Sequence, residues 1–540
     1  MKKIRNLREK IIIFAGILLL IAGISMLIWI NFMKQNYSLH NDSAAELALS
    51  KLLSEEGGIL SRNWYYSTEL RILNTQLVYT PLFHIFENWA TVRALGNLIL
   101  YFIMIISYIF FTRQLSIKRH LIIFTLPFLL FMPSGTFLDM IGVDTFYIPH
   151  IVMGFCYIGI YLKYFSIKSK DRIKQLFCII VYLLLSFLCG MSGTRYLMNI
   201  QAPLLLAGIL FFCLSNERKA LRYNFTLSNF NNAVKSGSAK RAIVSIAGIV
   251  VAMTGYFVNT KVLQQIYSFQ NYSDKTFRAI DSEFISDIGF VINGFLSLMG
   301  YRANVKFFSL AGLCNICILL FFIIVFYIIV RNLLNRQNSL TDAQLLTILF
   351  FLSSLFISIF LTLMTKELVN RYYIPVIIFY IPIVAIYLNK QDEYISDKIF
   401  CSSALLYILL LTTFITVSTY SKKDSSADKQ GATNFLVENN YTFGWATFWN
   451  ADVFTYLSNG LFEVAHIYEP QSMTAFKWLS PKKYYESGYY SGQVFLLLSE
   501  SERLKFQNAP VILEGVQVYQ DAYYTIYIYA SSVLDKYLQL

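Results

Sequence analysis

Long apolar runs dominate this chain and restrict what it can fold into. The first extends from Ile11 to Met33, between Lys10 and Lys34, and exceeds the roughly 20 residues needed to cross a bilayer. It is too long for a signal-peptide core, and no small-residue cleavage site follows it. Further runs of spanning length lie at 94–112, 121–137, 147–162, 176–191, 199–214, 242–258, 308–330, 343–364, 373–389 and 399–419. We therefore expect an α-helical polytopic membrane protein with about eleven transmembrane helices.

Charge gives the expected orientation of these helices. Only 14% of the residues are charged and 56% are hydrophobic, whereas an average soluble chain has about a quarter charged residues. This composition excludes a soluble globular enzyme and a disordered chain. With a cytoplasmic amino terminus, the loops on that side carry a net +16 and the outer segments −3, which accounts for the total of +13. The basic excess lies where the positive-inside rule expects it, so it gives no reason to expect a nucleic-acid partner.

The expected division is a membrane domain at 1–420, with helices on the outer face within 37–90, and an extracytoplasmic domain at 421–540. An odd number of spans places the carboxyl terminus outside a plasma membrane. The tail opens with the polar linker SKKDSSAD. A helical pattern at 432–440 is followed by an extended one at 442–449, and a second helical pattern at 451–459 is followed by an extended one at 461–468. Further extended patterns lie at 494–499, 510–519 and 523–530. This order predicts an α+β domain.

Aromatic residues gather near the start of that domain, at Trp445, Phe448 and Trp449. Aromatic faces suit stacking on carbohydrate, but packing within a sheet or core is the commoner use. Both interpretations stay open at this point.

The first outer segment begins with the most specific stretch of the chain, NYSLHNDSAAELALSKLLSEEGG at 36–58. Ser43 followed by Glu46 fits a capping box, and the apolar spacing that follows predicts an amphipathic helix at the membrane surface, ended by Gly57-Gly58. Asp42 then lies at the helix start, with Glu46 one turn later on the same face. Capping, or interaction with the helix dipole, is the alternative role for these side chains.

This arrangement resembles the GT-C superfamily of polytopic glycosyltransferases, which includes protein O-mannosyltransferases, oligosaccharyltransferases and aminoarabinose transferases. The shared features are one span, a long outer loop opening with an acidic residue (here Asn41-Asp42-Ser43), an acidic second outer loop, many further spans and an outer carboxyl-terminal domain. The likeness covers the membrane portion in outline and the first loop in detail. It implies transfer of a sugar, with inversion, from a polyprenyl-phosphate donor to a saccharide, lipid or protein acceptor at the outer membrane face.

The resemblance gives roles to several carboxylates. Asp42 is expected to be the general base that deprotonates the acceptor hydroxyl, with Glu69 as a second catalytic candidate. In the next outer loop, PSGTFLDMIGVDTFYIPH at 133–150, Asp144 is a catalytic candidate and Asp139 a substrate-binding one. A turn role is the alternative for both, and Asp144 could also cap the span that follows. A divalent metal, Mg²⁺ or Mn²⁺, is another use of such carboxylates, but the loop has no clear paired-acid motif, so no metal ligands are assigned.

The leaving lipid phosphate needs positive charge. Arg195 and Arg371 lie at the outer ends of spans, where such a phosphate would lie, and His150 is a further donor. Interfacial anchoring, or pairing of Arg371 with Glu367, is the alternative.

Trp64 and Tyr65, in NWYYSTEL, are the candidates for stacking on a sugar, with a place in the aromatic belt at the membrane interface as the alternative. Three rival functions remain. A transporter or flippase of lipid-linked saccharides would carry charges near the bilayer midplane. A polysaccharide polymerase would need larger charged outer loops. A scaffold would not need so many spans.

Overall fold

The structure is a computed structural model that describes residues 2–168, 170–214, 237–269, 282–334, 340–365, 369–390, 426–486 and 488–539. The chain divides into two compact units. The first consists of Met1–Leu27, Leu100–Asn259 and Lys275–Ser421. The second consists of Ile28–Ile99, Thr260–Asp274 and Lys422–Leu540. The first outer segment and the tail thus belong to the same compact unit.

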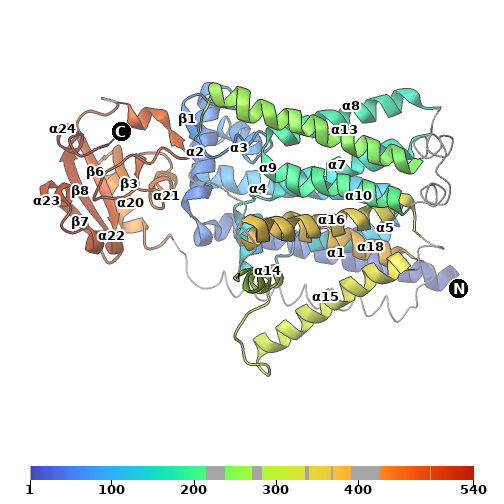
Figure 1. Cartoon of the computed structure of the whole chain (residues 1–540). Helices are drawn as coiled ribbons and strands as arrows, with labels where there is room; N and C mark the ends of the chain where they lie inside the picture. Colours follow the sequence, from blue (N-terminus) through green and yellow to red (C-terminus); the bar gives the residue numbers. More distant parts are fainter. Residues whose placement is uncertain are drawn as a thin grey trace. The chain divides into compact units, whose positions relative to one another are not determined.

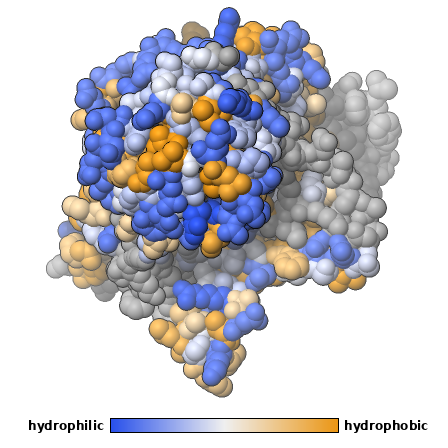
Figure 2. Space-filling view, turned by 90° about the vertical axis from the view of Figure 1, so that its left-hand side faces the viewer, coloured by the Kyte–Doolittle hydropathy of each residue, from blue (hydrophilic) through white to orange (hydrophobic). Residues whose placement is uncertain are grey.

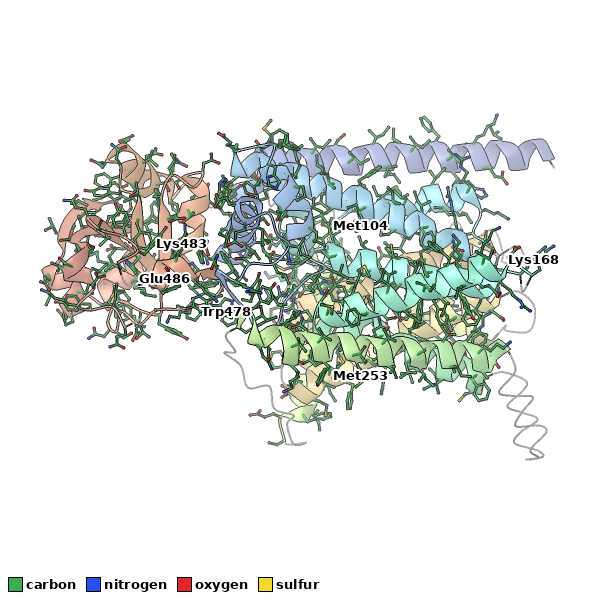
Figure 3. The ribbon with its side chains drawn as sticks, turned by 90° about the horizontal axis from the view of Figure 1, so that it is seen from above. Met104, Lys168, Met253, Trp478, Lys483 and Glu486 are labelled. Carbon is green, nitrogen blue, oxygen red and sulfur yellow. The ribbon has the colours of Figure 1, made fainter. Side chains whose placement is uncertain are left out.

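Within the described residues, nine helical segments are long and apolar enough to cross a membrane. They confirm nine of the predicted runs, and the chain is a multi-pass membrane protein. Their main helices are α1 (Lys2–Met33), α4 (Trp89–Gln114), α7 (Ile148–Ser166), α8 (Arg172–Met191), α10 (Ala202–Cys213), α13 (Gly237–Phe257), α15 (Leu310–Leu334), α16 (Asp342–Thr365) and α18 (Tyr380–Asn389). Met253 of α13 is 59% exposed, as expected of a lipid-facing side chain, whereas Met104 of α4 is fully buried (Figure 3).

The prediction of a single span at 121–137 is wrong. Helix α5 (Arg119–Thr125) passes into the short 3₁₀ helix η2 (Leu126–Leu129), and α6 (Gly135–Phe137) and the π-helix η3 (Leu138–Val143) follow. Pro127 and Pro133 interrupt this run because proline has no amide hydrogen and its ring clashes with the preceding turn. The predicted span at 399–419 lies outside the described residues. An apolar helix, α14 (Phe284–Leu298), occurs where only a loop was predicted.

Small residues let the helices of the first unit approach closely. Helix α8 packs against α7 and α13, and α10 packs against α13 and α16 (Figure 1). A Cβ added at Gly190 would lie 1.8 Å from the backbone oxygen of Ala252, and one added at Gly255 would lie 2.2 Å from that of Phe187. Glycine at both positions is therefore required by the α8–α13 contact, as in other membrane helix pairs.

The tail of the second unit contains a five-stranded sheet in the order β4-β3-β6-β8-β7. Strand β3 is parallel to β4 and β6, and β8 is antiparallel to β6 and β7. The strands are β3 (Phe443–Thr447), β4 (Glu463–Ile467), β6 (Gln493–Ser499), β7 (Val516–Gln520) and β8 (Tyr524–Ala530). Alternate residues of β6 enter two different hydrophobic clusters, so both faces of the sheet are buried.

Helices cover the sheet: α20 (Gln430–Glu438), α21 (Ala451–Leu457), α22 (Glu500–Lys505) and α23 (Pro510–Glu514). The predicted α+β class is confirmed. The extended prediction at 510–519 is wrong in its first half, which is α23, because Pro510 begins a helix there. The face shown in Figure 2 is mainly hydrophilic, with small hydrophobic patches.

The first outer segment forms α2 (Asn41–Glu56), β1 (Trp64–Tyr66) and α3 (Gln76–Phe83). The predicted helix is confirmed, including its end at Gly57, whose φ is +73°. The predicted capping box of Ser43 and Glu46 is wrong. The cap residue is His40, and the Ser43 hydroxyl donates to its carbonyl oxygen at 2.8 Å. The Glu46 carboxylate instead bonds side chains outside the helix.

Candidate functional site

A cavity of about 400 Å³ lies in the second unit, where parallel strands β3 and β4 end. Thr447 and Ile467, the last residues of these strands, are register partners and line the cavity. Most of the wall is aromatic and consists of Phe448, Trp449, Tyr468, Phe476 and Trp478. Sheets with parallel strands commonly bind ligands just beyond the carboxyl ends of those strands. The position of this cavity therefore marks it as a candidate binding site.

Asp42, the predicted general base, lines the same cavity. It lies in the first turn of α2 and is half-buried. The partial positive charge of a helix amino terminus favours a carboxylate at this position. The structure thus places the predicted base at the aromatic cavity.

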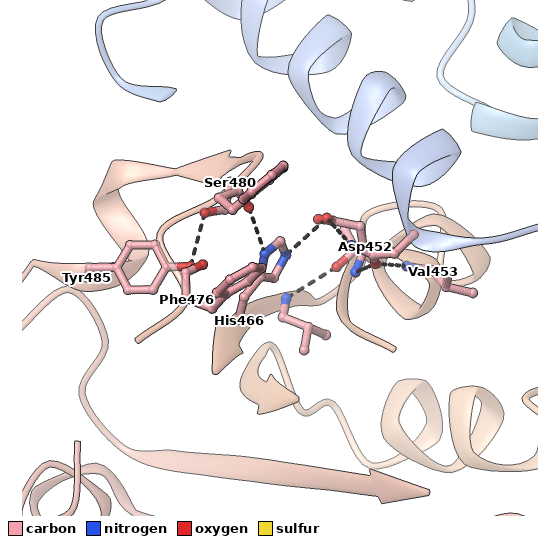
Figure 4. Close-up of polar contacts among 10 residues, drawn as sticks. Asp452, Val453, His466, Phe476, Ser480 and Tyr485 are labelled. Carbon is pink, nitrogen blue, oxygen red and sulfur yellow. Dashed lines mark hydrogen bonds and ion pairs between the residues drawn. The ribbon is translucent and has the colours of Figure 1, made fainter. Parts of the chain in front are cut away.

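A chain of buried polar contacts attaches the start of α2 to the tail (Figure 4). The amide nitrogen of Asn41 donates to Oδ2 of Asp452 at 3.1 Å, and its Oδ1 accepts the backbone N–H groups of Asp452 and Val453 at 2.7 and 3.3 Å. Oδ2 of Asp452 lies 3.0 Å from Nε2 of His466, and Nδ1 of His466 lies 3.1 Å from the carbonyl oxygen of Trp478. Asn41, Asp452 and His466 are at most 2% exposed.

This chain positions two walls of the cavity at once. A carbonyl oxygen only accepts, so Nδ1 of His466 carries a hydrogen toward Trp478. The other ring nitrogen, Nε2, faces the Asp452 carboxylate at 3.0 Å. Asn41 immediately precedes Asp42, and Trp478 is itself a wall residue. The Tyr485 hydroxyl also donates to the carbonyl oxygen of Phe476 at 3.0 Å, which fixes the neighbouring part of the wall.

Glu46 lies one turn after Asp42 on α2. Its carboxylate accepts hydrogen bonds from Nδ2 of Asn74, at 2.9 and 3.0 Å, and from the Thr75 hydroxyl at 3.0 Å. Burial raises the pKa of Glu46 above its ordinary value, and the charge of Asp42 raises it further, against the lowering effect of Arg71 and these hydrogen bonds. Of the two carboxylates on this helix face, Glu46 is therefore the one whose oxygens already accept hydrogen bonds from neighbouring side chains.

Replacing Glu46 with glutamine is expected to stabilise the second unit increasingly as pH rises. Because the pKa of Glu46 is raised from 4.5 in the folded protein, the neutral carboxyl contributes stability below pH 4.5 that is lost as the pH rises through the folded pKa. Glutamine stays neutral, so the melting temperature of Glu46→Gln minus that of the wild type should grow from pH 4.5 toward neutrality. Tryptophan fluorescence reports this, because all six tryptophans lie in the second unit.

The matched control is Glu55→Gln, on the same helix, where the side chain is 57% exposed and pairs with Lys51 at 3.2 Å. This variant should show little pH-dependent difference from the wild type. If the melting temperature of Glu46→Gln minus that of the wild type were constant over the same pH range, burial would not raise the pKa of the Glu46 carboxyl.

The first unit brings the predicted phosphate-binding cations onto neighbouring elements. The ring of His150, at the start of α7, stacks on Tyr196 with centroids 4.3 Å apart. Arg195 precedes Tyr196, and its guanidinium lies 5.0 Å from the ring centroid of Tyr372. Arg371 precedes Tyr372 in the 3₁₀ helix η7 (Asn370–Tyr373). His150 and Arg195, which come from segments far apart in sequence, thus each meet a tyrosine ring, and Arg371 is the chain neighbour of one of these tyrosines.

The loop at 133–150 has two unusual features. The side chain of Asp144 is only 3% exposed, and Thr145 has a φ of +56°, a conformation that is rare and strained for a β-branched residue. Asp144 does not cap α7, because Tyr147 occupies that position. Asp139 lies half-buried in η3. Strain of this kind next to a buried carboxylate is found at functional sites.

The remaining candidates lie in the second unit. Trp64 is fully buried in a cluster with Leu49 and Leu53, so its ring has no face open to a sugar. Tyr65 points the other way on β1 and is half-buried, with the Lys482 ammonium 5.7 Å from its ring centroid. Glu69 is half-buried and does not line the aromatic cavity. Neither Trp64 nor Glu69 is therefore brought to the cavity beside Asp42.

Among the residues that the structure describes, no group of three or more His, Cys, Asp or Glu side chains is placed to hold a metal ion. Sequence reasoning also missed several buried polar residues. Arg93 of α4 is 2% exposed, donates to the carbonyl oxygen of Gln35 at 3.1 Å and lies over the ring of Tyr456. Arg93 directly precedes a predicted span, which resembles ordinary interfacial anchoring, so the sequence offered no signal.

No family model matches the chain, and no curated protein matches it. Among solved structures, the archaeal oligosaccharyltransferase AglB from Archaeoglobus fulgidus, in complex with an inhibitory peptide and a dolichol-phosphate, is similar over 89% of this chain and 69% of its own, at 10% identity and a TM-score of 0.49. ArnT from Cupriavidus metallidurans bound to undecaprenyl phosphate is similar over 96% of this chain and 98% of its own, at 8% identity and a TM-score of 0.40. Its apo state gives a TM-score of 0.43. TM-scores below 0.5 establish neither a shared fold nor a shared activity, so the function proposed below depends on the residues of this chain.

Proposed function

We propose that this protein is a membrane glycosyltransferase of the GT-C kind, which transfers a sugar from a polyprenyl-phosphate donor to an acceptor on the outer face of the plasma membrane. The observation that carries the proposal is the position of Asp42, whose carboxylate lines an aromatic cavity of about 400 Å³. A carboxylate beside a pocket of this size, in the range of roughly 300–1,000 Å³ that small-molecule sites occupy, is what activation of an acceptor hydroxyl requires.

In the proposed reaction, Asp42 accepts the proton of an acceptor hydroxyl while the oxygen of that hydroxyl attacks the anomeric carbon of the donor sugar. A bond forms between the acceptor oxygen and that carbon, while the bond from the carbon to the phosphate oxygen breaks. Attack from the face opposite the leaving group inverts the anomeric configuration. The electron pair of the broken bond leaves with the polyprenyl phosphate, whose developing charge needs cations to stabilise it.

The first unit offers cations suited to that role. The guanidinium of Arg195 lies over the ring of Tyr372, and Arg371 directly precedes that tyrosine in the chain. A guanidinium binds phosphate oxygens through two parallel N–H donors. We assign Arg195 and Arg371 to the donor phosphate, with His150, whose ring stacks on Tyr196, as a further donor.

The test is a transfer assay with the full chain in liposomes that contain undecaprenyl-phosphate-linked sugars and candidate acceptors. Formation of undecaprenyl phosphate together with a glycosylated acceptor is the expected result. Sugar-lipid that crosses the bilayer unchanged, in a protein that consumes no donor, would contradict the proposal and favour a transporter.

Replacing Arg195 with glutamine is expected to raise the KM for the donor by about 10- to 100-fold, since a hydrogen bond to a charged group contributes about 1.5–3 kcal/mol. The KM for the acceptor should change little. The matched control is Arg113→Gln, an exposed arginine in the last turn of α4. An Arg195→Gln variant with the donor KM of the control would exclude Arg195 from the phosphate site.

A further inference from the structure

We infer that the acceptor is a neutral saccharide and that it stacks on Trp449 and Tyr468 in the cavity beside Asp42. This inference rests on the proposed function, and it adds the chemical class of the acceptor and the residues that recognise it. It concerns the second unit alone, where every described residue of the cavity lies.

The first observation is that two large aromatic side chains of the cavity are open to solvent. Trp449 is 66% exposed and Tyr468 is 48% exposed. Trp445, only four residues before Trp449, is 3% exposed and packs in the sheet core. Aromatic side chains bury large areas where packing decides their position, so rings left open at the edge of a cavity are available to a ligand.

The second observation is that neighbouring rings hold this surface in place. Phe448 meets Trp449 edge-on, with centroids 5.1 Å apart, and meets Phe476 in the same way at 5.3 Å. Phe476 is nearly parallel to Trp478, at an interplanar angle of 14°, and Tyr468 stands at 72° to Phe476. Flat faces are therefore presented in two directions by a pre-organised cluster, which lowers the entropy lost on binding.

The composition of the wall favours a neutral sugar over other occupants. A pyranose has a flat C–H face that suits an aromatic ring, and hydroxyl groups that donate to a carboxylate. The described lining residues include the Asp42 carboxylate but no lysine or arginine, so an anionic group would be repelled. An isoprenoid chain would cover Asp42 without offering it a hydrogen bond, at the cost of desolvating a charge.

The position beyond the carboxyl ends of β3 and β4 is an independent argument. Thr447 ends one parallel strand, Phe448 and Trp449 follow it directly, and Tyr468 follows the other strand. The same edge receives Asp42 from α2, attached through the buried contact of Asn41 with Asp452. The aromatic surface after β3 and β4 and the proposed base at the start of α2 therefore lie at the same edge of the sheet.

Binding is tested with the full chain in detergent, without donor, by saturation-transfer NMR. The probes are neutral tetrasaccharides of glucose, mannose, galactose and N-acetylglucosamine, with geraniol as the isoprenoid probe. At least one tetrasaccharide should bind, and Tyr468→Ala or Trp449→Ala should weaken it by about 3- to 10-fold each. The matched control is Tyr523→Ala, where the tyrosine is 46% exposed and does not line the cavity.

Binding of no tetrasaccharide, binding unaffected by both cavity variants, or competition by geraniol would overturn the inference. In the transfer assay, Trp449→Ala should raise the KM for the acceptor while leaving the donor KM unchanged. Transfer that is insensitive to Trp449→Ala would overturn the acceptor subsite and leave the transferase standing. Saccharide binding that depends on Trp449, in a protein that consumes no donor, would support the saccharide site and contradict the transferase.

Discussion

Replacing Asp42 with asparagine is expected to lower the turnover number for sugar transfer by about 100- to 10,000-fold, the usual contribution of a general base. Asparagine keeps the size of the side chain but cannot take up the acceptor proton. Because Asp42 is half-buried in the first turn of α2, loss of its charge removes only a helix-dipole interaction of about 0.3–1 kcal/mol. The measurement is the initial rate at saturating donor and acceptor, with tryptophan fluorescence to confirm folding of the second unit.

The control is Glu55→Gln, which removes an exposed carboxylate from the same helix and should transfer at the wild-type rate. Tetrasaccharide binding by Asp42→Asn should persist, since the aromatic surface is unchanged. Transfer by a folded Asp42→Asn variant at a rate within a few-fold of the control would mean that another group takes the proton.

Glu46 is the neighbouring alternative, and its contacts argue against it. Both of its oxygens accept hydrogen bonds from Asn74, and one also accepts from Thr75. Asp42 lines the cavity and Glu46 does not. A base needs an oxygen within reach of the acceptor hydroxyl, and of these two carboxylates Asp42 is the one at the cavity. If Asp42→Asn kept its activity, Glu46→Gln would be the next variant to assay.

Apolar length was enough to predict most membrane helices, because a span needs about 20 apolar residues whatever surrounds it. Apolar length failed as a predictor where prolines interrupt the helix within an apolar run. Pro127 and Pro133 interrupt the run at 121–137, and the sequence displays both prolines. It also failed for α14, which has 15 residues and is too short to be recognised as a span.

The aromatic residues show what a single sequence cannot decide. Trp64 and Trp449 both stand in aromatic stretches, but Trp64 is fully buried and Trp449 is 66% exposed. Alternation along β1 places Trp64 and Tyr66 on the buried face and Tyr65 on the other. Trp449 lies beyond the end of β3, where alternation no longer applies. Strand boundaries therefore decide which aromatic residues reach a ligand, and boundaries are the weakest part of a prediction from sequence.

The cavity itself could not be predicted, because its walls come from distant segments. Asn41 and Asp452 are separated by 411 positions, yet they share two hydrogen bonds in the protein interior. Asn41 reads as an ordinary residue before a helix, and His466 as an ordinary residue of a strand. Asp42 was a candidate from the sequence because an acidic residue after the first span is a local pattern, whereas the contacts that position it are not local.

Replacing His466 with alanine is expected to destabilise the second unit by about 2–5 kcal/mol, because it leaves a cavity at a fully buried position and removes a polar partner of a buried carboxylate. His466 is fully buried and Asp452 is 2% exposed, so the variant leaves the Asp452 carboxylate without its partner at 3.0 Å. It also removes the contact with the carbonyl oxygen of Trp478. Thermal unfolding followed by tryptophan fluorescence should therefore show a lower melting temperature.

The matched control is His84→Ala, which removes an exposed histidine from the same unit and should leave the melting temperature nearly unchanged. The chain of polar contacts holds both Asp42 and Trp478. A milder variant can therefore test whether these contacts position Asp42 for catalysis, without unfolding the second unit. Asn41→Ser shortens the side chain that bonds Asp452, so it should raise the acceptor KM and lower turnover together at temperatures where the unit is folded. A His466→Ala protein as stable as the His84→Ala control would show that the buried chain does not hold the start of α2 against the tail.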